Sequence, residues 1–136
     1  MAVVRRAITK QTDKNKLYRK SQSAIREVYF SYHTERCKVS EESGVNIHNP
    51  TRANIAHIID KGRHKSVQSH LDNFIYLTIQ EHTDFDKLLF ENNFGALEKS
   101  FPNAWGIALE RLKIVLPECL EKTKFIIKLE EYLSSR

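Results

Sequence analysis

The sequence has few of the residues that build a disulfide framework, a zinc knuckle or a membrane span. Only two of its 136 residues are cysteines, and Cys37 and Cys119 are far apart and form no CxxC motif. One disulfide is possible, but neither a disulfide scaffold nor a zinc site is indicated. No apolar run approaches the roughly 20 residues that span a bilayer, and the first ten residues do not resemble a secretory signal. We therefore predict a cytoplasmic protein of a reducing compartment with no membrane partner.

The motifs of the common enzyme classes are also missing. There is no glycine-rich phosphate loop, no Ser-His-Asp spacing and no paired acidic cluster at helical spacing. His33 and Cys37 are four residues apart, but no further metal ligands accompany them. We therefore predict no catalytic residues, no cofactor and no metal site.

The distribution of charge is more informative than the net charge of +5. Residues 1–71 hold 14 Lys and Arg against 6 Asp and Glu, a net charge of +8, whereas residues 72–136 hold 8 against 11, a net of −3. This asymmetry favours a first half that meets a polyanion and a second half with another role. A solvated basic face is the simpler alternative.

Apolar residues recur at intervals of three and four along most of the chain, which is the period of an amphipathic helix. Only the run 74–79, rich in β-branched and aromatic residues, is equally compatible with a short strand. We therefore predict an all-α fold in one compact domain. The expected helices span 15–37, 51–59, 66–74, 84–101, 103–116 and 118–133, with a loop over 39–50.

Two of these expected helices, 51–59 and 66–74, are short and are joined by a tight turn that contains Gly62. This is the arrangement of a helix-turn-helix, whose second helix enters the major groove of DNA. With Val67, Leu71 and Phe74 facing inward, the polar residues at the start of the second helix face outward and suit contacts with bases and phosphates. The candidate DNA-binding residues of this region are Arg52, Asn54, Arg63, His64, Lys65, Ser66, Gln68 and Ser69.

The segment from Pro50-Thr51-Arg52-Ala53-Asn54-Ile55-Ala56 to His70-Leu71 resembles the helix-turn-helix of the LexA repressor family. Residues 62–74 are similar, more weakly, to the amino-terminal DNA-binding segment of the plasmid regulator KfrA. The resemblance covers residues 50–75 and implies that 66–74 is the recognition helix. It predicts a sequence-specific double-stranded DNA-binding protein without enzymatic activity, either a transcriptional repressor or a plasmid or phage accessory regulator.

Two alternatives remain open on the sequence. Arg52 and His57 are separated by four residues, which resembles the Arg-X4–6-His signature of HEPN-type ribonucleases. That resemblance implies that the arginine steadies a phosphate while the histidine transfers a proton. The same loose pattern occurs at Arg26 with His33 and at Arg63 with His70. The second alternative is a helical module that binds another protein, and the simplest interpretation of 51–75 is two packed helices of a bundle.

The expected division of the chain follows from these patterns. Residues 1–13 form a flexible basic arm in which Arg5 and Arg6 are candidate DNA contacts. Residues 14–80 form a helical DNA-binding region, and 81–136 form a helical oligomerisation region. Because repressors bind palindromic sites as dimers, we expect a homodimer through 103–133, although one chain could also bury these apolar faces internally.

Overall fold

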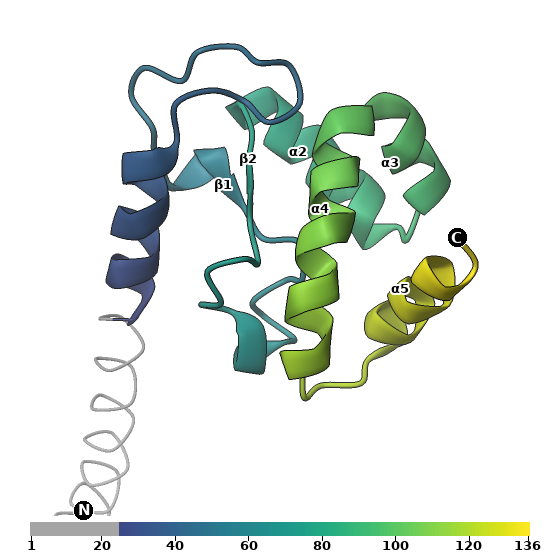
Figure 1. Ribbon diagram of the computed structural model, residues 1–136. Helices are drawn as coiled ribbons and strands as arrows, with labels where there is room; N and C mark the ends of the chain where they lie inside the picture. Colours follow the sequence, from purple (N-terminus) through teal and green to yellow (C-terminus); the bar gives the residue numbers. More distant parts are fainter. Residues whose placement is uncertain (1–24) are drawn as a thin grey trace, which may run out of the picture.

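The structure, a computed structural model, describes residues 25–136 (Figure 1). The predicted arm with Arg5 and Arg6 lies outside the described residues, as does the first part of the helix expected over 15–37. The described chain starts in a helix over 25–36 and is mainly helical, with one small sheet. Its further elements are η1 (Arg52–Asn54), β1 (Ile55–Ala56), η2 (Lys65–Val67), β2 (Ile75–Tyr76), α2 (Ile79–Phe90), α3 (Phe94–Ser100), α4 (Pro102–Val115), η3 (Leu116–Glu118) and α5 (Lys124–Ser134).

The two strands are antiparallel and lie between the helix 25–36 and α4 (Figure 1). Ile55 pairs with Tyr76 and Ala56 pairs with Ile75. The strand alternative for the run 74–79 is therefore confirmed. Helix α2 follows β2 after two residues, so the order along the chain is strand, long loop, strand and helix.

The prediction of two helices over 51–59 and 66–74 is wrong. Thr51 does cap a helical turn, and the Asn54 side chain turns back to accept from the Thr51 amide, but η1 ends after three residues, where Ile55 becomes extended. Its neighbours Ile55 and Ala56 then enter the sheet, where pairing with β2 buries both of them. In the second segment only η2 is helical, and Leu71 is 44% exposed although an inward-facing position was expected. The described residues 51–75 contain no α-helix.

The helices of the second half agree with the sequence pattern in part. The single helix expected over 84–101 is two helices, α2 and α3, which separate where Asn92 has a φ of 57°. The helix expected over 118–133 begins only at Lys124. A capping box of Thr78 and Glu81 starts α2 and satisfies its free amide groups. Helix α4 has Pro102 in its first turn, where the missing N–H costs no hydrogen bond. Among residues 25–136 no helix has both the length and the apolar character that crossing a bilayer requires.

One hydrophobic core joins both halves of the described chain. Ile58, Ile59 and Leu77 from around the sheet pack with Trp105 of α4 and Ile126 of α5, and all five are at most 1% exposed. The apolar faces expected to form a dimer interface over 103–133 are thus largely buried within a single chain. The homodimer stays a prediction.

Candidate functional site

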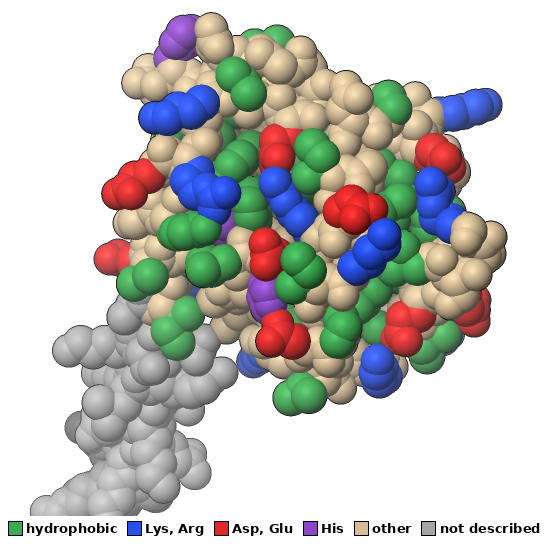
Figure 2. Space-filling view, viewed as in Figure 1, with side chains coloured by type: hydrophobic (Ala, Val, Ile, Leu, Met, Phe, Trp, Pro, Cys, Tyr) green, Lys and Arg blue, Asp and Glu red, His purple; other side chains and the backbone are tan. Residues whose placement is uncertain are grey.

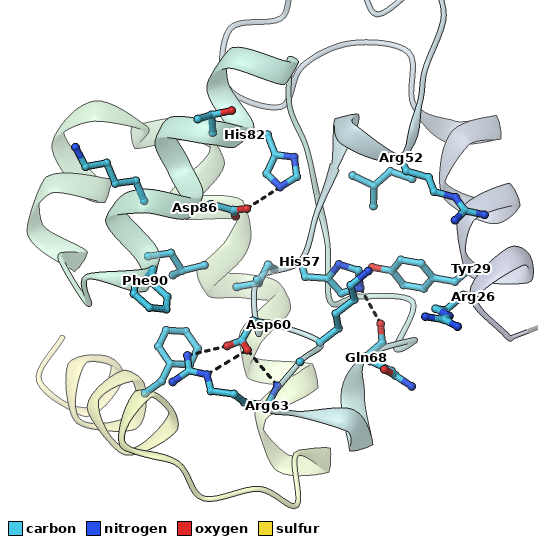
Figure 3. A pocket seen from close by; sticks show the side chains of 18 of the residues that line it. Arg26, Tyr29, Arg52, His57, Asp60, Arg63, Gln68, His82, Asp86 and Phe90 are labelled. Atoms are coloured by element: carbon cyan, nitrogen blue, oxygen red, sulfur yellow. Dashed lines mark hydrogen bonds and ion pairs between the residues drawn. The ribbon is translucent and has the colours of Figure 1, made fainter. Parts of the chain in front are cut away.

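A cleft of about 910 Å³ lies between the helix 25–36, the loop after β1 and helix α2 (Figure 3). Its walls carry more basic than acidic side chains. Such a cleft attracts an anionic ligand, because nearby positive charges add and their field is focused between low-dielectric walls. The basic lining residues are Arg26, Arg52, Lys61, Arg63 and Lys87, and the acidic ones are Asp60, Asp86 and Glu91.

His57, directly after β1, lines this cleft and has a fixed orientation. Its Nε2 lies 2.8 Å from the main-chain oxygen of Gln68 (Figure 3). Because a carbonyl oxygen only accepts, Nε2 carries the proton, and Nδ1 of the neutral ring keeps its lone pair. The ring also stacks on Tyr29, with 5.2 Å between centroids and 17° between planes. Burial lowers the pKa of His57, and nearby Lys61 lowers it further, so the imidazole is neutral at pH 7 and able to accept a proton.

Asn73 holds the loop that fixes His57. This side chain is fully buried, and its Oδ1 accepts from the Ile59 amide at 2.8 Å. Its Nδ2 donates to the main-chain oxygens of Ile59 at 2.9 Å and Val67 at 3.1 Å. One amide thus joins the start of the loop to the turn just before Gln68, whose carbonyl orients His57. The Tyr29 hydroxyl donates to the Asn73 main-chain oxygen at 2.7 Å, which fastens the helix 25–36 to the same point.

His82 and Asp86 form an ion pair on the opposite wall of the cleft. They are four residues apart on α2, and 2.9 Å separates His82 Nε2 from Asp86 Oδ2 (Figure 3). His82 Nδ1 lies 2.6 Å from the main-chain oxygen of Ala53, so it must be the donor there. The hydrogen bond to Asp86 raises the pKa of His82. All three residues line the same cleft, and the charge of Asp86 raises the pKa of His57 whereas that of His82 lowers it.

This pair could hold a metal ion only if His82 released the Nε2 proton that it shares with Asp86. A metal-bound histidine commonly donates its other ring N–H to a carbonyl, as His82 does to Ala53. Within residues 25–136 no group of three or more His, Cys, Asp or Glu side chains gathers to hold a metal. Water and a substrate phosphate would therefore have to complete the coordination.

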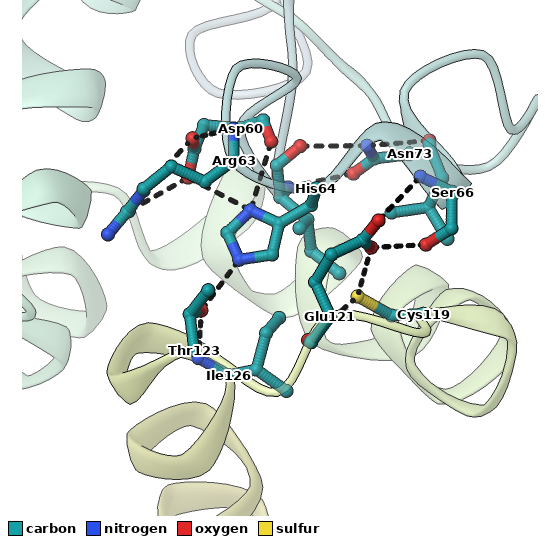
Figure 4. A network of polar contacts seen from close by, with 11 residues as sticks. Asp60, Arg63, His64, Ser66, Asn73, Cys119, Glu121, Thr123 and Ile126 are labelled. Atoms are coloured by element: carbon teal, nitrogen blue, oxygen red, sulfur yellow. Dashed lines mark hydrogen bonds and ion pairs between the residues drawn. The ribbon is translucent and has the colours of Figure 1, made fainter.

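Several residues predicted to contact DNA instead stabilise the loop between the strands (Figure 4). His64 is fully buried, and its Nε2 lies 2.7 Å from the Thr123 hydroxyl. Ser66 is bonded through its amide and its hydroxyl to Glu121. The loop is thus attached to the segment that precedes α5, and these side chains are committed to contacts within the chain.

The other predicted residues are distributed as follows. Asn54 is 5% exposed and donates to the Leu77 main-chain oxygen, so its predicted DNA contact is wrong. The same correction applies to buried His64. Ser69 is half-buried, whereas Lys65 is exposed. Arg52, Arg63 and Gln68 do line the cleft; the Arg63 guanidinium pairs with Asp60, and Arg52 lies over the Phe30 ring at 5.0 Å. On the face seen in Figure 2, basic and acidic side chains are interspersed and form no continuous basic patch.

The sequence pattern predicted Arg52 and His57 as a candidate pair, but the cleft residues His82 and Asp86 and the loop-holding Asn73 were not predicted. The four-residue spacing of His82 and Asp86 on a helix was a usable signal, since it places both side chains on one face. Nothing in the sequence pattern marked Asn73, because its role depends on which carbonyls the loop brings to it. Neither protein-family models, nor curated proteins, nor solved structures contain a match to this chain.

Proposed function

We propose that the chain is a divalent-metal-dependent phosphodiester hydrolase that acts on nucleic acid. The observation that carries the proposal is the placement of a neutral, oriented His57 across a basic cleft from the His82–Asp86 pair. An oriented base, a cation site and positive charge for a phosphate are the three components that metal-assisted phosphodiester hydrolysis requires.

In this mechanism His57 is the general base. Its Nδ1 takes a proton from a water molecule, whose oxygen attacks phosphorus while the bond from phosphorus to the leaving oxygen breaks, and the leaving oxygen takes a proton from solvent. The Gln68 carbonyl holds the ring in the tautomer that this step needs. Arg52 and Lys61 line the cleft and attract the phosphate. His82 and Asp86 would hold a divalent cation, which would supply positive charge to the phosphate oxygens.

A hydrolysis assay with matched variants tests the proposal. Labelled single-stranded and duplex DNA and RNA are incubated with the protein in Mg²⁺, Mn²⁺ or Zn²⁺, and in EDTA. We expect cleavage only with metal, and a fall in kcat of about 10²–10⁴-fold in His57→Ala, the usual contribution of a general base. Asp86→Asn should lower the cleavage rate and abolish its increase with added metal. Asp84→Asn is the control, because Asp84 lies on α2 but does not line the cleft.

The pH profile is a second readout of the same proposal. Because burial lowers the pKa of His57, the base should remain active at pH values below the usual histidine range of about 6.5. The rate should fall only when the pH drops below that lowered pKa. Absence of cleavage of every substrate with every metal would refute the proposal.

The ribonuclease alternative shares part of this site, since Arg52 and His57 both line the cleft. A 2′-hydroxyl can replace water as the nucleophile in RNA, so this alternative predicts cleavage of RNA, but not of DNA, in EDTA. Sequence-specific DNA binding by a regulator stays a prediction; the recognition helix expected for it over 66–74 is not α-helical.

A further inference from the structure

One aromatic side chain in the cleft has no part in the chemistry proposed above. Phe90 is the last residue of α2 and lines the cleft, yet it is 79% exposed. The aromatic residue Phe85 on the same helix is fully buried in the core. Phe90 therefore offers a free ring face to whatever enters the cleft.

Helix geometry places this ring next to the proposed phosphate position. His82, Asp86 and Phe90 are spaced by four residues, so they lie along one face of α2 and share one wall of the cleft (Figure 3). With a rise of 1.5 Å per residue, the backbone at Phe90 is about 6 Å along the helix axis from Asp86. This is within the reach of a base attached to a nucleotide whose phosphate lies at the His82–Asp86 pair.

The cleft combines charged groups with apolar surface. Apolar surface from Leu89, Phe90 and Phe125 lines it together with the charged pair of Asp60 and Arg63, whose guanidinium lies over the Phe125 ring. A nucleotide likewise combines an anionic phosphate with a base that has a flat π-face. Bases in a duplex are stacked on one another, so only an unpaired base can place its face on a protein ring.

We propose that Phe90 is the stacking platform for one unpaired base next to the phosphate in the cleft, which makes single-stranded nucleic acid the substrate class. This inference rests on the proposed function for the position of the phosphate. It is nevertheless testable by binding alone, without any hydrolysis.

The experiment is a fluorescence-anisotropy titration, in Ca²⁺ and in parallel in EDTA, with three probes: a labelled dT decamer, an abasic sugar-phosphate decamer of equal charge, and the dT decamer paired with dA. We expect wild type to bind the dT decamer about tenfold more tightly than either other probe, as is typical of one base stacked on an aromatic ring. Phe90→Ala should lose this preference, and Phe90→Trp should keep it. Ile79→Ala is the control, because Ile79 is 60% exposed on α2 but does not line the cleft.

Each outcome distinguishes the two proposals. Equal binding of the dT and abasic decamers by wild type, or an unchanged preference in Phe90→Ala, overturns the stacking proposal even where metal-dependent cleavage is observed. A preference that depends on Phe90, together with no cleavage under any metal, supports the stacking site and refutes the hydrolase. Tighter binding of the duplex than of the single strand overturns single-stranded nucleic acid as the substrate class.

Discussion

The buried amide of Asn73 makes a stability prediction that does not depend on any function. Its side chain makes three hydrogen bonds to the backbone, at 2.8, 2.9 and 3.1 Å. A typical buried hydrogen bond contributes about 1 kcal/mol net, and its loss leaves a buried partner without hydration. Asn73→Ala should therefore lower the free energy of unfolding by about 3 kcal/mol, which lowers Tm by roughly 10 °C in a chain of this size.

Chemical denaturation followed by the fluorescence of buried Trp105 measures this loss. Asn73→Asp is a stricter test of the same hydrogen bonds, because a carboxylate keeps only the contact with the Ile59 amide and faces two carbonyl oxygens. We expect this variant to be at least as destabilised as Asn73→Ala at pH 7. Asn46→Ala, at an exposed position, should stay within about 0.5 kcal/mol of wild type. If the free energy of unfolding of Asn73→Ala also lies within 1 kcal/mol of the wild-type value, then the Asn73 amide does not hold the loop and does not fix the carbonyl that orients His57.

Two further stability predictions concern ion pairs. Asp86 raises the pKa of His82 above the unfolded value, so this pair stabilises the fold at low pH and the contribution is lost as pH rises through the folded pKa. Asp86→Asn should therefore destabilise more at pH 5 than at pH 8, and an equal effect at both would contradict the pairing. Arg111 makes two 2.7 Å bonds to Glu41 with both side chains mostly buried. We expect Arg111→Ala to lower the free energy of unfolding in urea by about 3 kcal/mol. Lys113→Ala, on the exposed side of α4, is the control and should lower it by about 0.5 kcal/mol or less. Similar losses in both variants would show that burial does not strengthen the Arg111 pair.

The helices of the second half could be predicted because their apolar spacing agrees with their burial. Along α4, for example, Trp105, Ala108, Leu109 and Leu112 are all buried, and they follow the three- and four-residue spacing of a helix face. The same spacing was misleading at 51–59. There Ala56, Ile58 and Ile59 are buried at nearly consecutive positions, and a short apolar run cannot be distinguished from a buried helix segment by periodicity alone.

Local pattern allowed a strand at 74–79, but it could not predict β1 or the pairing of the two strands, since each is only two residues long. Their pairing brings Ile55 beside Tyr76 across a loop of 18 residues. The packing of Tyr29 and Phe74 around the sheet stabilises that contact. Predicted DNA contacts at Asn54 and His64 failed for the same reason: both side chains are polar, and only the tertiary structure shows that they face backbone and core.

The sequence by itself determined the mainly helical character of the second half and the basic character of the first half, because periodicity and charge are properties of neighbouring residues. It also placed Arg52 and His57 together as a candidate pair. Only the tertiary structure decided that His57 faces the His82–Asp86 pair. This juxtaposition depends on a loop held by Asn73 and on a strand pairing between distant residues, and such long-range contacts have no local signature in the chain.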